Sequence, residues 1–499
     1  MMRIARESGS YDDERAAKNK RNQHSRRIKQ RIKTYYKEKF RNNLKRFKTL
    51  KELDDEQARG PTTIIKDGEE ISSPKRIAEE MSRGFVEKVQ RIRNKINGNR
   101  YEAIRSYKNA IPRNENDFKL EIVSVEQVYN IINNMKTSNS CGNDELTSRI
   151  IKQMPSYVAT ATCHLFNSIV RLAKFPEALK TARLTPILKP GKTSTNIESY
   201  RPISNLNIVE KVIEEVIRSQ LEKFLTKTKV ITPNHHGGRK NHSTATAKSA
   251  MDMDINNFRD KNLAIGVLTT DLSAAYDTVD THLLLNKLEH IGVRGSELEI
   301  LRTYLMDRNA YVEIQGYTSE VLSQPNCSVV QGSKLSTTLY TIYTLDITEV
   351  KKIMTNPEEF KRIVGKDKQQ TTETNVRSTG YINDVTHVVA GINKEDLEIE
   401  LHNLYSLLET LYKNNILQMN GTKTCFVVIN SPHDNDHPER LSIRIDDKNI
   451  IKEDDCIKIL GFFQNKRNSM DTQLNAIAAK TGMIMSKLRK AVPYMDNHS

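Results

Sequence analysis

Residues 380–389 have the sequence GYINDVTHVV, in which two apolar runs flank a short polar segment. The pattern predicts a tight β-hairpin with Asn383 and Asp384 at its tip, because Asn and Asp tolerate the positive φ angles of such turns. A carboxylate at a hairpin tip is also well placed to bind a metal ion. A simple structural turn is the alternative for this segment taken alone, so the rest of the sequence has to decide between the two.

A second acidic residue, Asp271, follows the strand predicted for IGVLTTDL (265–272). Taken alone, it could equally cap a helix or a turn. Carboxylates from two separate strands are the ligands that a two-metal site for nucleotidyl transfer requires, with the metals about 3.5–4 Å apart. Between the two acids, Gln331, Gly332 and Ser333 predict a turn before a helix, where the backbone can approach a ligand closely. A purely structural turn is the alternative there.

Several other segments carry clear secondary-structure signals. Ser73 and Pro74 predict the start of a helix, whose apolar residues recur every fourth position at Ile77, Met81, Phe85 and Val89. Asp280 is the predicted cap of a helix in DTHLLLNKLEHIG. Residues 355–379 are polar and turn-rich, which predicts a loop or insertion, and residues 473–492 predict a helix.

The bulk composition is typical of a soluble globular protein. With 499 residues, 28% charged and 37% apolar, the chain is long enough for two or three domains. No apolar run reaches the roughly 20 residues of a membrane helix, and the polar N-terminus is not a secretory signal. The five cysteines are scattered without a CxxC pair, so neither a disulfide framework nor a zinc site is predicted. We therefore expect an intracellular protein, in the nucleus or the cytoplasm, that contacts no membrane.

Positive charge is concentrated at the N-terminus. Residues 1–50 carry 17 Lys or Arg and 5 Asp or Glu, which accounts for +12 of the net charge of +16. This segment predicts a basic helical arm that binds phosphates, because each neutralised phosphate releases condensed counterions. A solvated basic helix is the alternative. Binding to an anionic membrane is less favoured, since the segment lacks a dense apolar face.

Eight segments, in this order, resemble the motifs of reverse transcriptases from non-LTR retrotransposons, most nearly the jockey-like elements of animals. The resemblance runs from about Ser138 to Phe462. The matching segments are PILKPGK (186–192) and ESYRPISNLNIVEKVIEEVI (198–217) for the fingers, HHGGRKNHST (235–244), TTDLSAAYDTVDTHLLLNKL (269–288) for motif A, VVQGSKLSTTLYTIYTLDI (329–347) for motif B, YINDVTHVV for motif C, NNILQMNGTKTCFVVI (414–429) for motif D and CIKILGFF (456–463) for motif E.

The resemblance implies catalytic roles for individual residues. Asp271, Asn383 and Asp384 take the positions of the metal ligands, for two Mg²⁺ ions that Mn²⁺ can replace. Lys423 would be the acid for the leaving pyrophosphate, and a solvated turn lysine is the alternative for it. Tyr276 would be a steric gate, because a ring packed under the sugar leaves no room for a 2′-hydroxyl.

The remaining implied roles concern the substrate and the primer. Lys189 and Arg201 would hold the incoming triphosphate, whose charge requires cationic donors. Gln331 and Gly332 would contact the nucleotide and its template base. The primer grip is expected in motif E, at Leu460 and Gly461.

Motif C departs from the family pattern YADDTxxV at Asn383, where the family has its first aspartate. Asparagine keeps a similar shape and one carbonyl oxygen but brings no charge. Two divalent ions would therefore face only two carboxylates, Asp271 and Asp384. Because Mg²⁺ is usually held by carboxylates and substrate phosphates, we expect this chain to fold as a reverse transcriptase but to polymerise poorly or not at all.

The implied fold class is α+β, a right-hand polymerase with fingers, an antiparallel-sheet palm and a partial helical thumb. Residues 1–118 would form the basic helical N-terminal region or linker, and residues 119–260 the fingers. The palm would span residues 261–462, within a reverse transcriptase domain of about 181–462, and residues 463–499 would begin the thumb.

The implied partners are an RNA template, a DNA primer and deoxynucleoside triphosphates. Nothing in residues 1–118 resembles an endonuclease, so we expect a piece of a longer open reading frame, with an element-encoded endonuclease or RNA-binding protein as a further partner. Two other functions stay open. One is a catalytically impaired remnant that acts only as an RNA-binding protein. The other is a metal nuclease, which has no use for the QGS turn or for a gate tyrosine.

Overall fold

The computed structural model describes residues 60–365, 375–429, 440–444 and 450–491, together with some residues between 19 and 38. Two compact units are present, one of residues 60–469 and one of residues 1–59 with 470–499. The smaller unit includes α18 (Asp471–Ala491), which confirms the helix predicted for the tail. The described residues between 19 and 38 are helical, but most of the basic arm predicted for residues 1–50 lies outside the described residues. None of the described helices has the length and apolar character needed to cross a membrane.

The larger unit alternates helices and short strands. Its helices are α4 (Pro74–Lys95), α5 (Arg100–Ala110), α6 (Val125–Asn134), α7 (Ser148–Ile151), α8 (Pro155–Leu172), α9 (Ile208–Lys227), α10 (Thr244–Arg259), α11 (Thr281–His290), α12 (Gly295–Leu305), α13 (Lys334–Tyr343), α14 (Leu345–Thr348), α15 (Val350–Met354), α16 (Pro357–Val364) and α17 (Lys394–Asn414), with 3-10 turns η2 (Glu177–Leu179) and η3 (Ile197–Ser199). Its strands are β1 (Ile64–Lys66), β2 (Glu69–Ile71), β3 (Thr181–Leu188), β4 (Tyr200–Asn205), β5 (Ala264–Thr270), β6 (Leu272–Ser273), β7 (Asn309–Ile314), β8 (Tyr317–Thr318), β9 (Leu322–Ser323), β10 (Asn375–Tyr381), β11 (Asp384–Gly391), β12 (Gln418–Met419), β13 (Cys425–Ile429), β14 (Ser442–Arg444), β15 (Ile450–Lys452), β16 (Cys456–Ile459) and β17 (Phe462–Asn465).

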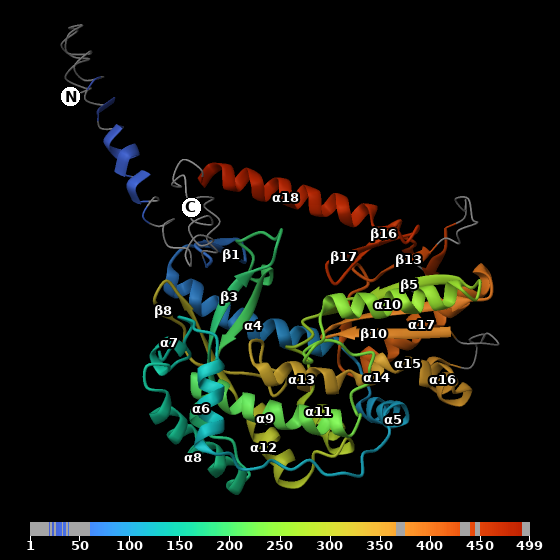
Figure 1. Cartoon of the computed structure of the whole chain (residues 1–499), viewed down its shortest axis with the longest axis horizontal. Helices are drawn as coiled ribbons and strands as arrows, with labels where there is room; N and C mark the ends of the chain where they lie inside the picture. Colours follow the sequence, from blue (N-terminus) through green and yellow to red (C-terminus); the bar gives the residue numbers. More distant parts are fainter. Residues whose placement is uncertain are drawn as a thin grey trace. The chain divides into compact units, whose positions relative to one another are not determined.

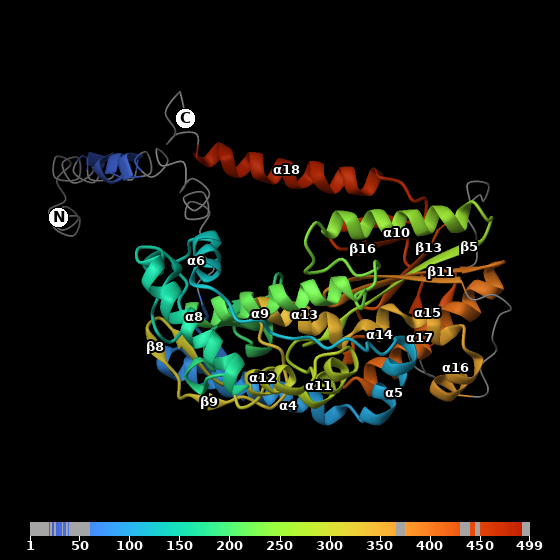
Figure 2. The same cartoon turned by 60° about the horizontal axis from the view of Figure 1, so that its bottom comes forward.

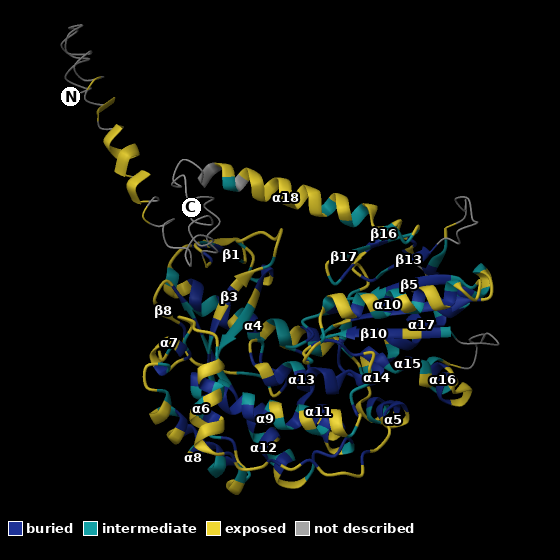
Figure 3. Ribbon diagram, in the orientation of Figure 1, coloured by how far each residue is buried: buried dark blue, intermediate teal, exposed yellow. Residues whose placement is uncertain are grey.

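An antiparallel sheet of four strands, in the order β10-β11-β5-β13 and called the central sheet below, lies in the right-hand part of the larger unit in Figure 1. Helix α10 covers one face of this sheet, and α15 and α17 cover the other (Figure 2). Alternate residues of a strand point to opposite faces, so Val267 packs with α10 while its neighbour Leu268 packs toward α17. The strands are therefore buried along most of their length, as Figure 3 shows for β5 and β10. The strand predicted before Asp271 is confirmed as β5.

A second sheet, in the order β4-β3-β7-β8 with β9 beside β7, carries the N-terminal helix α4. Strands β3 and β4 are antiparallel, whereas β3 and β7 are parallel. The apolar side of α4, with Ile77, Met81 and Phe85, shares one hydrophobic cluster with Leu184 of β3 and Val312 of β7. The helix predicted at Ser73 and Pro74 is confirmed, and its apolar stripe packs on this sheet.

Three further predictions from the sequence concern a helix cap, a loop and a domain boundary, and their outcomes differ. The helix cap at Asp280 is confirmed, because its side chain accepts a hydrogen bond from the backbone nitrogen of Leu283 at 3.0 Å. The loop predicted for residues 355–379 is wrong in part, since this range contains α16 and the start of β10, and Asn356 caps α16 before Pro357. Residues 366–374 of that range lie outside the described residues. Residues 60–118 belong to the same compact unit as the two sheets, and the domain boundary expected at residue 118 stays a prediction.

Candidate active site

The two predicted acids meet at one end of the central sheet. Thr270, the last residue of β5, pairs with Val385 of β11. Asp271 and Asp384 are the next residues on these adjacent antiparallel strands, so they lie side by side. Tyr381 pairs with Asp384 and closes the hairpin. The meeting of Asp271 with the hairpin tip is thereby confirmed, and the antiparallel register is its physical cause.

The hairpin turn itself differs from the predicted one. Because Tyr381 and Asp384 already pair as strand residues, Ile382 and Asn383 are the two loop residues. Ile382 has the positive φ angle, 60°, so the prediction that Asn383 and Asp384 would adopt positive φ angles was wrong. A β-branched residue is strained in that conformation. Gly237 makes room for this turn, since a Cβ on it would lie 2.2 Å from the backbone nitrogen of Ile382.

A lysine from the turn after β12 reaches the acid pair. The backbone nitrogen of Asn420 donates to the carbonyl oxygen of Asp271 at 2.8 Å, and Lys423 Nζ donates to Asp271 Oδ2 at 2.9 Å. Asp384 is exposed as a whole residue, but its carboxylate is partly desolvated, which raises its pKa. The charge of Asp271 raises the pKa of Asp384 further, and Lys423 opposes the rise. Lys423 forms this ion pair with 63% of its side chain exposed, so both its role as an acid and the alternative of a solvated turn lysine stay predictions.

The donors at this end of the sheet fit a divalent cation only in part. Asp271 and Asp384 supply charged oxygen ligands of the kind that hard cations prefer, whereas Asn383 can add only a neutral oxygen. Within the described ranges, no group of three or more His, Cys, Asp or Glu could hold a metal. The expected pair of ions would share two carboxylates and one neutral oxygen with the substrate phosphates, and its binding stays a prediction.

The predicted gate residue is held by an aromatic partner. The ring of Tyr276 stacks on that of Tyr340 in α13, with centroids 4.9 Å apart and planes inclined by 5°. Burial raises the pKa of Tyr340 well above its usual value, and Tyr276 and Asp384 are among the neighbours that add to the rise. Tyr340 therefore lies near both Tyr276 and Asp384. The stacking fixes the orientation of the Tyr276 ring.

The turn before α13 joins three parts of the chain. Gln331 Nε2 donates to Asp277 Oδ1 at 2.7 Å, and the carbonyl oxygen of Gln331 accepts from the backbone nitrogen of Ser204 in β4 at 2.8 Å. Gly332 has a φ of 115°, and a Cβ on it would lie 2.6 Å from the carbonyl oxygen of Ser204. The glycine is thus required both by its backbone conformation and by close contact with the second sheet.

Cations gather beside this turn. Lys189 Nζ donates to the carbonyl oxygen of Glu198 at 2.9 Å, and burial, followed by Lys88 and Arg201, lowers the pKa of Lys189 to about 8. Burial raises the pKa of Asp277 to about 6, with Lys88 and Lys189 among the groups that oppose the rise. Lys189 therefore lies near Asp277 and also near Arg201, which is exposed. Lys88 of α4 joins them although sequence reasoning missed it.

A buried polar network supports the turn from behind. Arg308 Nη2 lies 2.7 Å from Glu210 Oε1, while the Tyr304 hydroxyl donates to Glu214 Oε1 at 2.5 Å and lies 3.1 Å from Ser333 Oγ. Burial raises the pKa of both glutamates. One guanidinium serves two carboxylates here, so burial disfavours the charged form of both acids. Sequence reasoning missed this network, although two acids four residues apart among apolar neighbours in α9 were the available signal.

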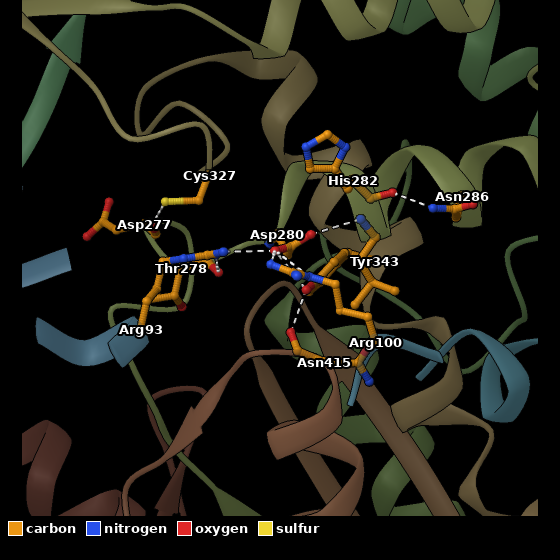
Figure 4. Close-up of polar contacts among 11 residues, drawn as sticks. Arg93, Arg100, Asp277, Thr278, Asp280, His282, Asn286, Cys327, Tyr343 and Asn415 are labelled. Atoms are coloured by element: carbon orange, nitrogen blue, oxygen red, sulfur yellow. Dashed lines mark hydrogen bonds and ion pairs between the residues drawn. The ribbon is translucent and has the colours of Figure 1, made fainter. Parts of the chain in front are cut away.

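Asp280 fastens the N-terminal segment to the motif A helix α11. Figure 4 shows Arg93 and Arg100 directed at this buried carboxylate, and their Nη2 atoms lie 2.8 Å and 2.7 Å from Asp280 Oδ2. Burial alone would raise the pKa of Asp280, but hydrogen bonds from Arg100 and Arg93 hold it below its usual value. The hydroxyl of Tyr343 accepts from the backbone nitrogen of Asp280 at 3.2 Å. Neither arginine was singled out from the sequence.

The predicted primer-grip residues form the turn between β16 and β17. Leu460 and Gly461 have φ angles of 52° and 90°, as a two-residue hairpin turn requires. The hairpin packs beside β13 through the cluster that contains Ile457 and Ile459. Gly461 is exposed on this turn and Leu460 is half-buried against that cluster, while a role in holding a primer stays a prediction.

The comparisons with known proteins agree with this arrangement. The sequence family described as reverse transcriptase (RNA-dependent DNA polymerase) matches residues 187–463, more than half of the 499-residue chain. The chain therefore belongs to the reverse transcriptase family.

Its curated relatives come from mobile elements. The RNA-directed DNA polymerase from mobile element jockey of Drosophila melanogaster is 30% identical over 229 residues, which cover 46% of this chain and 25% of the relative. The probable RNA-directed DNA polymerase from transposon BS of the same species is 28% identical over 225 residues, which cover 45% of this chain and 25% of the relative. The chain is similar to a jockey-like reverse transcriptase of a non-LTR retrotransposon, and the match spans about a quarter of the length of these relatives.

Proposed function

We propose that this chain is the polymerase part of a non-LTR retrotransposon reverse transcriptase and that it extends a DNA primer on an RNA template. The central sheet would be the palm, the β3–β4 region the fingers and α18 the start of the thumb. The single observation that supports this best is the register of β5 with β11, which brings Asp271 to Asp384. The gate tyrosine and the Gln331–Gly332 turn lie within the same region.

In the proposed reaction the primer 3′-hydroxyl oxygen attacks the α-phosphorus of a deoxynucleoside triphosphate. The bond from the α-phosphorus to the bridging oxygen breaks and pyrophosphate leaves, while the hydroxyl proton passes to solvent. Lys189 and Arg201 would bind the triphosphate, and Tyr276 would exclude a 2′-hydroxyl. Lys423 would protonate the pyrophosphate after leaving its ion pair with Asp271. A divalent cation, held by Asp271 and Asp384, would neutralise phosphate charge when bound.

We further propose that Asn383 makes this chain a slow polymerase. The donor set lacks one carboxylate for the second ion, and Mg²⁺ is bound poorly by neutral amide oxygens alone. An RNA-binding remnant is the second candidate function, and Asn383 is the observation that favours it.

Primer extension with the full chain tests both candidates. Purified protein is incubated with an RNA template, a DNA primer and all four deoxynucleotides in Mg²⁺ or Mn²⁺, beside an Asp271→Asn control. Weak extension that the control abolishes supports the polymerase. RNA binding that weakens steeply with salt, without any extension, supports the remnant. Cleavage of RNA or DNA without nucleotides would instead indicate a nuclease.

A further inference from the structure

Two cations pair with one carboxylate at the edge of the second sheet, and a third cation contacts the backbone of the same residue. Glu198 forms ion pairs with Arg91 and with Lys88, whose Nζ lies 3.7 Å from Glu198 Oε2. Lys189 Nζ donates to the carbonyl oxygen of the same residue at 2.9 Å. Arg201 lies in the same ladder, opposite Ile187 in the β3–β4 pair. The cluster therefore carries an excess of positive charge.

This crowding is built into the fold. The side chain of Lys88 is only 13% exposed, so its ammonium is not simply extended into solvent. Helix α4 lies close to η3, since a Cβ on Gly84 would lie 3.0 Å from Ile197 Cγ2. Like charges repel one another at such distances. An anion that binds beside the two partly buried lysines, Lys88 and Lys189, would relieve this repulsion.

The cluster also adjoins the residues predicted to contact the nucleotide. Lys88 and Lys189 both act on the carboxylate of Asp277, which accepts from Gln331 at 2.7 Å. The neighbouring α4 residues Phe85 and Val89 line a small cavity of about 70 Å³ that also touches Asp277 and Gln331. Lys88 precedes Val89 on α4 but does not itself line this cavity.

We propose that Lys88 is a third phosphate ligand, which acts with Lys189 and Arg201 on the triphosphate of the incoming nucleotide. This proposal rests on the proposed polymerase function, and it makes α4 a part of the nucleotide site rather than a linker. A triphosphate brings up to four negative charges, which balance the excess of cations. Three donors from α4, the end of β3 and β4 would hold it from separate directions.

The test compares Lys88→Met with a matched control, Lys75→Ala, on the full chain. Methionine keeps the aliphatic stem that packs against the protein but removes the charge. Lys75 lies on the same helix and is exposed. Binding of dATP and of inorganic tripolyphosphate is measured by calorimetry, together with the melting temperature of each variant. Lys88→Arg serves as the conservative variant, and Lys189→Ala as the reference for loss.

We expect Lys88→Met to weaken dATP and tripolyphosphate binding about 10-fold or more, as the loss of one charge-assisted hydrogen bond does. Lys75→Ala should bind as the wild type does, and Lys88→Arg should recover most of the affinity. If Lys88→Met melts at a lower temperature but binds dATP as the wild type does, Lys88 is only a structural partner of Glu198 and the proposal is wrong. Weakened RNA binding with unchanged dATP affinity would also overturn it, in favour of a backbone contact.

The failure of this inference differs from failure of the proposed function. If Lys189→Ala loses dATP binding while Lys88→Met retains it, only the assignment of Lys88 is wrong. If the wild type binds neither dATP nor tripolyphosphate, both the assignment and the nucleotide site fail together.

Discussion

Replacing Asn383 by aspartate should restore polymerase activity. In the present chain Asp271, Asp384 and Lys423 leave one net negative charge at the end of the sheet. Asn383→Asp doubles that charge at the loop position beside Asp384. One preorganised electrostatic contact is worth about 2.7–4 kcal/mol in the transition state, or roughly 10²–10³ in rate. We therefore expect primer extension to rise by about that factor in Mg²⁺.

The matched control is Asn420→Asp. Asn420 donates from its backbone to Asp271 at 2.8 Å, so this substitution adds the same charge near the same acid but outside the hairpin turn. It should leave extension near the wild-type rate. Equal extension by the wild type and Asn383→Asp would refute the reasoning, and so would an equal gain from Asn420→Asp.

A second readout does not depend on turnover. Two carboxylates about 4 Å apart repel by about 1 kcal/mol even at the dielectric constant of water. Without divalent cations, Asn383→Asp should therefore melt at a lower temperature than the wild type. Mg²⁺ binding to the folded state should reverse this difference, because a ligand stabilises the state that binds it. An Mg²⁺-induced rise no larger than that of the wild type would contradict the expected ligand role.

Three further substitutions test the supporting structure. Arg308→Met leaves Glu210 and its partner acid buried without a cation, so the free energy of unfolding should fall by about 3–5 kcal/mol at pH 7.5 and by less at lower pH, where proton uptake removes the uncompensated charge, as urea denaturation would measure. The pKa of Asp277 is raised from 3.8 to about 6, so its ionisation lowers the stability of the folded state above pH 6 and has no such effect below pH 4. Asp277→Asn should therefore raise the free energy of unfolding by up to about 3 kcal/mol at pH 7.5. This gain should shrink toward pH 4. Gly332→Ala forces a Cβ to within 2.6 Å of the carbonyl oxygen of Ser204 and should lower the melting temperature and weaken dATP binding, whereas unchanged values would show that the turn can shift.

Local signals predicted much of the fold. Ser73 with Pro74 and Asp280 each marked a helix start that the structure contains, because caps act within one turn of the chain. Motif order indicated that Asp271 would meet the hairpin tip, and the strand register bears this out. Asn356 and Pro357 carried a comparable signal for α16, which was missed inside a polar segment.

Contacts between residues far apart in the chain could not be predicted from the sequence. The approach of Lys88 to Lys189 depends on how α4 packs on a sheet formed much later in the chain, and no spacing rule encodes that. The positive φ of Ile382 was missed because residue preference favoured Asn and Asp, while tertiary contact with Gly237 shapes the turn. Both misses arise from packing that overrides local preference.

The ion pairs of Asp280 with Arg93 and Arg100 affect how this protein should be produced in the laboratory. An expression fragment that started at residue 119, where the fingers were expected to begin, would lack Arg93 and Arg100. The buried carboxylate of Asp280 would then have neither of these cationic partners. Losing the partners of such a charge costs about 3–5 kcal/mol, a large part of the stability of an ordinary domain. A fragment that keeps residues 60–469 together is the one to attempt for crystallisation, and insolubility of the shorter one would not count against the polymerase assignment.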